Sequence, residues 1–259
     1  MSGILNKAQI EQFITDGFIR IDDAFPAATA KEAVDILWKD IPFDRHAPET
    51  WTEPVVWLGM YTQPPFIASV NNDTLFAIFN QLAGPGNWLL CKSVGAFPVR
   101  FPSAKTSADT GIHVDAGFPG EDPNDYFAWR INVRSKGRAL LMLILYSDVS
   151  AADAPTVIYK GSHLHVARLL HPYGDAGLSF SELAGKLHDL PAYEKVLATG
   201  KAGTIYLCHP HIAHAAQPHH GHAPRFMAQP PLLLKTVLDM DDYTNAPPIA
   251  QAIQRAVEQ

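Results

Sequence analysis

Two residues that can bind a metal, His113 and Asp115, are separated by a single residue in a stretch that we predict to be a strand. Because side chains alternate along a strand, both would lie on the same face and could reach one ion. A distant histidine, His214, would complete a set of two imidazoles and one carboxylate. Such a set leaves the other coordination positions open, which is typical of non-haem Fe(II) oxygenases.

The choice of the second histidine needs an argument, because six of the twelve histidines lie between His209 and His222. Three of them surround a glycine between two prolines, in a segment whose composition is typical of a solvated loop: His219, His220 and His222. His209 precedes a proline that would disrupt a strand, and His211 lies in the same turn. His214 begins the next apolar stretch, so we expect it to be the ligand. In the alternative, His209 or His211 binds the metal and His214 is a hydrogen-bonded core histidine.

The segments that must position these residues change in character near residue 86. Before it, apolar periodicity predicts helices after Asn6, after Pro26 and from Asn72 to Gly84. After it, short apolar runs alternate with turn residues, which favours a sandwich or jelly roll. The predicted strands are Leu89–Val94, Pro98–Phe101, Gly111–Ala116, Tyr126–Val133, Ala139–Tyr146, Thr156–Tyr159, Thr204–Leu207, Ala213–Gln217 and Arg225–Leu234. Helices are predicted at His163–Leu170, at Ser179–Leu187 and around Ile249–Ala256.

Composition restricts the class of protein further. With 259 residues and 47% hydrophobic residues, the chain can bury one substantial core, and we expect a single domain. The longest apolar run, Ala139–Tyr146, is too short to span a membrane, and the N-terminus lacks the pattern of a secretory signal. Two cysteines favour the reducing cytoplasm. The net charge of −6 disfavours nucleic acid and anionic membranes as partners.

Four segments together resemble one known family. Leu5–Ile21, Gly111–Asp115, Ala154–His163 and Gly203–His214 followed by Arg225 are similar, in order and spacing, to motifs of the phytanoyl-CoA dioxygenase (PhyH-like) family of Fe(II)- and 2-oxoglutarate-dependent oxygenases. Two departures are visible: Lys160 stands where proline is usual, and Ala216 stands where a hydroxyl residue is frequent. We expect Tyr146 or water to supply the hydrogen bond that Ala216 cannot make.

The resemblance implies a mainly β fold with flanking helices, a double-stranded β-helix of the jelly-roll, cupin-like kind. The single domain 1–259 would then comprise a mostly helical flank (1–86), the β-helix core (87–235) and a C-terminal helix (236–259). Fe(II) bound by His113, Asp115 and His214 would use O2 and the cosubstrate 2-oxoglutarate. Arg225, eleven residues after His214, would anchor the cosubstrate carboxylate. His163 is a weaker candidate near the cosubstrate, since its segment also suits a helix-capping turn.

The expected activity is hydroxylation of an unactivated carbon of a small or medium organic metabolite. The segment after Asp115 offers aromatic and basic residues for the substrate: Phe118, Tyr126, Phe127 and Trp129, with Arg130 or Arg134 for an acidic group. One alternative is a cupin-like metal-binding protein or isomerase that does not use 2-oxoglutarate. Another is a metal buffer that uses the histidines of residues 209–222. Neither substrate identity nor oligomeric state follows from the sequence.

Overall fold

The computed structural model describes residues 5–105 and 107–258, and its first helix shows how local sequence sets the element boundaries. Helix α1 (Lys7–Asp16) begins with a capping box in which the side chains of Asn6 and Gln9 each accept from the other's backbone N–H. It ends at Gly17, whose φ of +83° is the left-handed conformation that glycine adopts without strain. The predicted start and stop of this helix are confirmed.

The helices predicted after Pro26 and from Asn72 to Gly84 are present, and one further helix lies between them. Helix α2 (Ala27–Leu37) follows Pro26, and α4 (Asp73–Ala83) is capped by the side chain of Asn72 and ends at Gly84. A short helix that we did not predict, α3 (Pro64–Val70), lies between them and begins with a proline at its first position, where proline is favourable. Strand β2 (Val55–Leu58) precedes it and pairs with β3 (Phe97–Arg100).

The strands form antiparallel sheets. The largest sheet has the order β1-β9-β5-β11, with β12 also paired to β5. It comprises β1 (Phe18–Ile21), β5 (Arg138–Leu145), β9 (Ile205–Cys208), β11 (Met227–Ala228) and β12 (Pro231–Leu233). A second sheet has the order β10-β6-β8, formed by β6 (Val157–Tyr159), β8 (Lys195–Leu197) and β10 (His214–Ala215). All eight residues of β5 are buried, as expected of a strand at the centre of the core.

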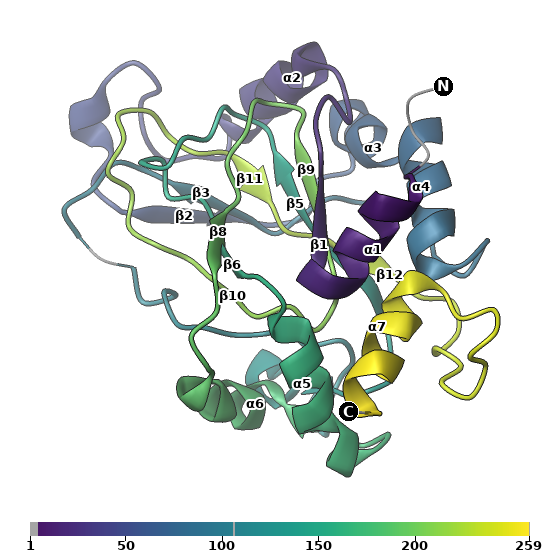
Figure 1. Ribbon diagram of the computed structural model, residues 1–259. Helices are drawn as coiled ribbons and strands as arrows, with labels where there is room; N and C mark the ends of the chain where they lie inside the picture. The colour runs from purple at the N-terminus through teal and green to yellow at the C-terminus, as the bar shows by residue number, and fades with distance from the viewer. Residues whose placement is uncertain (1–4, 106, 259) are drawn as a thin grey trace.

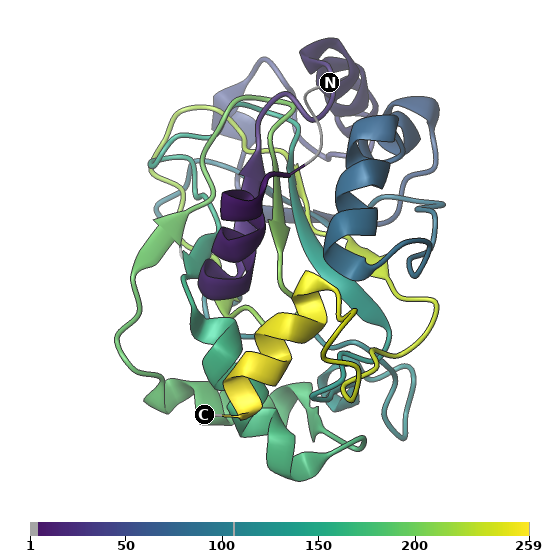
Figure 2. The same cartoon turned by 45° about the vertical axis from the view of Figure 1, so that its right-hand side comes forward.

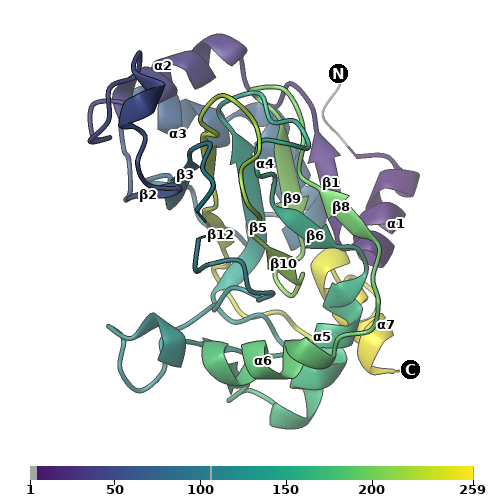
Figure 3. The same cartoon turned by 90° about the vertical axis from the view of Figure 1, so that its left-hand side faces the viewer.

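Helices enclose this β core. Helices α1, α4 and α7 (Pro248–Val257) lie on one side of the large sheet (Figures 1 and 2). Figure 3 shows β6, β8 and β10 beside β5 and β9, with α2 at one end and α5 (Ser162–Leu170) and α6 (Phe180–Lys186) at the other. The larger of two hydrophobic clusters contains residues from Leu5 to Ala256, and the smaller one includes Phe18 and Leu143. Among the described residues, no helix combines the length and apolar character needed to cross a membrane.

Five predicted strands are wrong or much shorter than expected. Of residues 213–217 only His214–Ala215 form a strand, and residues 225–234 are divided into the short strands β11 and β12. Residues 89–94 contribute only an isolated bridge between Val94 and Tyr61, and Leu90 is largely exposed. The stretch 111–116 contributes only one bridge, at His113. Residues 126–128 form a single 3-10 turn, because the side chain of Asp125 accepts from the Phe127 N–H. The strand that follows, β4, spans only Arg130–Ile131 and pairs with β7 (Leu178–Ser179). Apolar and aromatic content alone did not distinguish these segments from strands.

Candidate metal and cosubstrate site

The backbone brings the two candidate histidine ligands directly opposite each other. His113 and His214 form an antiparallel bridge in which each N–H donates to the other's carbonyl, at 3.0 and 2.9 Å. His214 is the first residue of β10, which pairs with β6, so the second sheet holds this end of the bridge. Asp115 follows two residues after His113. Residues from distant parts of the chain are therefore placed together by main-chain pairing.

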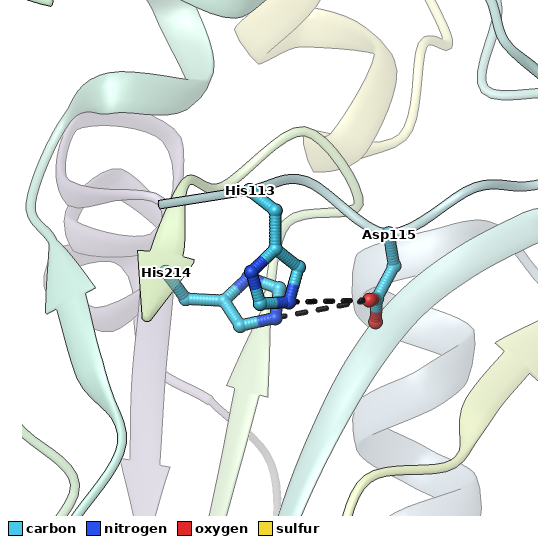
Figure 4. Close-up of side chains that lie close together, drawn as sticks. All are labelled: His113, Asp115 and His214. Carbon is cyan, nitrogen blue, oxygen red and sulfur yellow. Dashed lines mark ion pairs between the residues drawn. The ribbon is translucent and has the colours of Figure 1, made fainter. Parts of the chain in front are cut away.

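Figure 4 shows the side chains of His113, His214 and Asp115 pointing toward one another. The Nε2 atoms of His113 and His214 lie 3.9 and 3.8 Å from Oδ1 of Asp115, and the two imidazole centroids are 4.4 Å apart. One potential ligand atom from each residue lies within 4.8 Å of the others. This spacing suits three atoms that bind a single ion, since metal–ligand bonds of about 2.0–2.2 Å place ligands roughly 3–4 Å apart. Among the described residues, the tract 209–222 forms no second cluster of this kind.

Backbone carbonyls fix the orientation of both imidazoles. Nδ1 of His113 lies 2.9 Å from the carbonyl of Gly111, and Nδ1 of His214 lies 3.2 Å from the carbonyl of Ile212. Because a carbonyl only accepts, each Nδ1 must carry the proton, and each Nε2 then presents its lone pair. Hydrogen bonds of this kind orient histidine ligands in metal sites.

A buried arginine holds the carboxylate. Nη1 of Arg138, the first residue of β5, donates to Oδ2 of Asp115 at 3.0 Å, and its Nη2 donates to the carbonyl of Ala116 at 3.0 Å. Oδ1 is the oxygen that faces the two histidines. The arginine therefore occupies one carboxylate oxygen and leaves the other for a cation.

Asp115 and His214 have the protonation states that bind a cation. Burial alone would raise the pKa of Asp115. The positive charge of Arg138 and, to a smaller extent, the neighbouring His214 and His113 together exceed this effect and hold the pKa below its usual value. Burial, followed by the proximity of His113, lowers the pKa of His214 to about 4. At neutral pH the carboxylate is ionised and the His214 imidazole is neutral, which are the forms that bind metals.

Arg225 lies in the same cavity, which has a volume of about 580 Å³ and is also lined by His113 and His214. Only 1% of Arg225 is exposed, and its Nη1 and Nη2 donate to the carbonyls of Ala154 at 2.6 Å and Pro98 at 3.0 Å. Burial, followed by the neighbouring Arg100, lowers its pKa to about 9. The partners of its two terminal nitrogens are neutral, so this cation has no direct counter-ion among the described residues.

An aromatic wall borders the metal cluster. Phe180 lies 5.8 Å from His113 between ring centroids, and it contacts Tyr126 at 5.3 Å and Phe127 at 5.8 Å. All three aromatic residues line the cavity. Burial, followed by the charge of Asp115, raises the pKa of Tyr126 to about 12, so its hydroxyl is neutral at physiological pH. The cavity thus combines an apolar surface with one phenol near the cluster.

Several residues expected at the site lie elsewhere. His163 is fully buried against α1, where its Nε2 bonds the carbonyl of Ile14, and it is absent from the described lining of the cavity. His209 and His211 bond the carbonyls of Ile249 and Asn132. The structure therefore brings none of these three histidines to the metal cluster, and it does not support the expected cosubstrate contact of His163.

Of the residues expected to contact the substrate, some line the cavity and others do not. Tyr126 and Phe127 line the cavity, but Phe118 contacts the ammonium of Lys136 and Trp129 donates to the carbonyl of Pro123. Arg130 and Arg134 donate to backbone carbonyls, of Ala176 and Gly177 and of Leu238 respectively. These two arginines therefore stabilise loops instead of facing the cavity.

Tyr146, one expected source of the hydroxyl that Ala216 lacks, lies outside the described lining of the cavity. It bonds the hydroxyl of Ser69 at 2.5 Å in the core. Thr156 does line it, and the Thr156 hydroxyl accepts from Gln229 Nε2 at 3.3 Å. Sequence reasoning missed this residue, although it directly precedes β6, which pairs with the strand of His214.

Two arginines of the site, Arg100 and Arg138, also escaped prediction. Each is a lone basic residue at the end of an apolar strand, Arg100 after Phe97–Val99 and Arg138 before Ala139–Leu145. An arginine so placed is buried and needs an anion, and this signal was available in the sequence.

Residues 106–227 match the model of the phytanoyl-CoA dioxygenase (PhyH) family. Among solved structures, the chain is similar to HygX from Streptomyces hygroscopicus, crystallised with nickel, 2-oxoglutarate and hygromycin B (17% identity, 87% of this chain and 86% of that chain, TM-score 0.52). It is also similar to SnoK, a non-haem α-ketoglutarate-dependent carbocyclase from nogalamycin biosynthesis (17% identity, 90% and 86%, TM-score 0.55). A hypothetical protein, JW0805 from Escherichia coli, is similar as well (16% identity, 89% and 68%, TM-score 0.57). A comparison with curated protein sequences gives no match.

The fold and the ligand cluster define a mainly β protein of the double-stranded β-helix class, as predicted. Over residues 106–227, which contain His113, Asp115, His214 and Arg225, the family match confirms the resemblance read from the sequence motifs.

Proposed function

We propose that the protein is an Fe(II)- and 2-oxoglutarate-dependent oxygenase. The observation that carries this proposal is the placement of His113, Asp115 and His214 in one cluster beside a cavity that also contains the buried Arg225. Two imidazoles and one carboxylate leave coordination positions free, and a buried arginine needs an anion. A metal site and an anion site in one cavity are what a metal-dependent enzyme with an acidic cosubstrate requires.

The residues present fit the metal. Nε2 of His113, Nε2 of His214 and Oδ1 of Asp115 would hold the iron, because both Nδ1 atoms and Oδ2 already have hydrogen-bond partners. Fe(II), when bound, supplies the coupled activation of O2 and oxidative decarboxylation of 2-oxoglutarate. Arg138 keeps the carboxylate oriented, and the two carbonyls keep the imidazoles oriented.

The cosubstrate would be held by the chain itself through its distal carboxylate. The guanidinium of Arg225 offers charge-assisted hydrogen bonds to that carboxylate. Its terminal nitrogens are fixed by Ala154 and Pro98, so it is oriented before the cosubstrate arrives. The hydroxyl of Thr156, which lines the same cavity, is the source we propose for the bond that Ala216 cannot provide.

The substrate that suits the cavity is a small or medium organic metabolite with an apolar or ring-shaped part. Tyr126, Phe127 and Phe180 provide the apolar surface beside His113, and the neutral Tyr126 hydroxyl can bond a polar substituent. We propose hydroxylation of an unactivated carbon as the reaction. SnoK is a carbocyclase and SnoN is an epimerase, both α-ketoglutarate-dependent, so proteins of this fold carry out more than one kind of reaction.

The proposal is tested by turnover of the cosubstrate. Apo-protein reconstituted with Fe(II) and 2-oxoglutarate in air should form succinate slowly even without substrate, and the rate should rise when a library of metabolites contains the substrate. Protein loaded with Zn(II), which has no redox chemistry, should form none. A protein that binds Fe(II) but neither binds nor consumes 2-oxoglutarate would instead be a cupin-like metal protein of the alternative class.

A further inference from the structure

A second arginine, Arg100, lies directly opposite Arg225. The two residues form an antiparallel bridge: the Arg225 N–H donates to the Arg100 carbonyl at 2.8 Å, and the Arg100 N–H donates to the Arg225 carbonyl at 3.2 Å. Residues paired in this way project their side chains to the same face of the sheet. Both arginines line the cavity that His113 and His214 also line.

Only one of the two buried guanidinium groups contacts a carboxylate among the described residues. Arg100 is 3% exposed and forms an ion pair with Asp109, whose other oxygen accepts from the hydroxyl of Ser107. Arg225 is 1% exposed, and the partners of its terminal nitrogens in the described part of the chain are main-chain carbonyls. The pair therefore holds two positive charges against the single negative charge of Asp109. Like charges placed directly opposite in a sheet are destabilising, and buried charges require compensation.

The hydrogen bonds show the same deficit. The Nε atoms of both Arg100 and Arg225 are buried without a hydrogen-bond partner among the residues that the structure describes. An unpaired buried donor of a charged group is destabilising, so two in one place indicate a missing acceptor. A carboxylate has two oxygens and could accept from both arginines while neutralising the surplus charge.

We propose that Arg100 is a second anchoring residue for the acidic cosubstrate, whose distal carboxylate is bound by Arg100 and Arg225 together. This inference rests on the proposed function. With the carboxylate bound, two guanidinium groups face two carboxylates, the second being Asp109. Asp109 thus acts as the permanent counter-ion of the pair, and the cosubstrate supplies the other negative charge.

The competing explanation is purely structural: Arg100 would serve only to fix the loop that contains Ser107 and Asp109 by pairing with Asp109. The two explanations differ in which ligand binds more weakly when Arg100 is replaced. A structural defect would weaken the binding of every 2-oxo acid, whereas loss of an anchor would weaken only the binding of a ligand that carries a distal carboxylate. 2-Oxopentanoate, in which a methyl group replaces that carboxylate, is the discriminating probe.

The experiment measures anaerobic binding of 2-oxoglutarate and of 2-oxopentanoate to the Fe(II)-loaded full-length protein by calorimetry. Arg100→Met should weaken 2-oxoglutarate binding by a factor of roughly ten or more, because it removes a charge-assisted contact. It should change 2-oxopentanoate binding less than about twofold. Arg100→Lys should recover part of the loss, because it restores charge without the planar fork.

Asp109→Asn is the matched control, since it breaks the same ion pair from the other side. The proposal expects it to preserve or tighten 2-oxoglutarate binding, because the positive charge facing the cosubstrate increases; weaker binding would favour the loop explanation. Equal losses for both ligands in Arg100→Met, or no loss for either, would overturn the proposal. If Arg100→Met fails to fold, Arg100→Lys and Asp109→Asn decide by the same comparison. Failure of the parent protein to bind 2-oxoglutarate at all would instead refute the proposed function.

Discussion

Arg138 holds the metal-site carboxylate by one oxygen: its Nη1 donates to Oδ2 of Asp115 at 3.0 Å, while Oδ1 of Asp115 faces both histidines. The arginine is also fixed by the carbonyl of Ala116 and belongs to the fully buried strand β5. A strand that is buried along its whole length thereby determines which carboxylate oxygen is free to bind a cation.

Replacing Arg138 should weaken metal binding without removing any ligand. Partners that orient ligands typically contribute a factor of about 10–100 in metal affinity, so we expect Arg138→Met to lose that much. Calorimetric titration with Mn(II) or Fe(II) measures it. Arg134→Met is the matched control, because Arg134 donates to the carbonyl of Leu238 and lies outside the described lining of the cavity. An unchanged metal affinity in Arg138→Met would show that Arg138 is not needed to orient the Asp115 carboxylate.

The identity of the second histidine ligand is tested by comparing histidines of one tract. His214→Ala should lose both iron and turnover, since its Nε2 faces Asp115. His209→Ala and His211→Ala should keep stoichiometric iron but unfold more easily, because each removes a buried side chain that bonds a backbone carbonyl. The exposed His220 provides a control that should change neither property. Iron content measured after desalting decides the matter, and a His211→Ala variant that loses iron while His214→Ala keeps it would reverse the assignment.

Arg225→Ala should mainly raise the concentration of 2-oxoglutarate that the protein requires, because it leaves the three metal ligands untouched. Losing one partner of a buried charge pair costs about 2–5 kcal/mol, which corresponds to a fall in affinity of roughly thirtyfold or more. Arg225→Lys should recover only part of the affinity. The dissociation constant of 2-oxoglutarate for the Fe(II)-loaded variants is the measurement, and parental affinity in both would place the anchor elsewhere.

Acid should destabilise the fold through three neutral histidines beneath helix α1. His163, His209 and His211 lie in a row with centroids 4.9 and 5.1 Å apart. Burial lowers the pKa of His163 and of His211 to about 4 and holds that of His209 well below its usual value. Below about pH 6.5 the unfolded chain therefore binds protons that the folded chain does not, so stability that is present at pH 7 declines as the pH falls.

The expected decline between pH 7 and pH 5.5 is about 1 kcal/mol for each histidine, or roughly 3 kcal/mol together. Urea denaturation of the metal-free protein at both values measures it. His163→Gln should reduce the pH dependence relative to the parent, whereas His220→Gln, at an exposed position, should leave it unchanged. An identical free energy of unfolding at the two pH values would contradict the protonation argument.

Sequence reasoning placed the metal cluster because its signal is local. His113 and Asp115 are two residues apart, and His214 begins an apolar stretch beyond a proline-containing turn. Alternation of side chains then requires only short extended segments, and the structure provides one bridge between His113 and His214. The longer strand expected at 111–116 was not needed for the geometry.

The supporting residues were harder to find because their partners are remote in sequence. Arg138 contacts Asp115 across 23 positions, and Arg100 lies opposite Arg225 across a much longer interval. No local spacing links such residues, and only the pairing of strands brings them together. His163 illustrates the opposite case, since a motif-like local context suggested a cosubstrate contact, whereas tertiary packing placed its ring against α1.

The most direct test of the account is an anaerobic titration of the apo-protein with Fe(II) and 2-oxoglutarate, followed by visible absorption. If His113, Asp115 and His214 bind the iron and Arg225 holds the cosubstrate beside it, a weak metal-to-ligand charge-transfer band should appear only when both are present. It should saturate at one equivalent of iron and be absent in Asp115→Ala. A protein that binds one equivalent of Fe(II) but gives no band at saturating 2-oxoglutarate, or gives the same band in Asp115→Ala, would contradict the account.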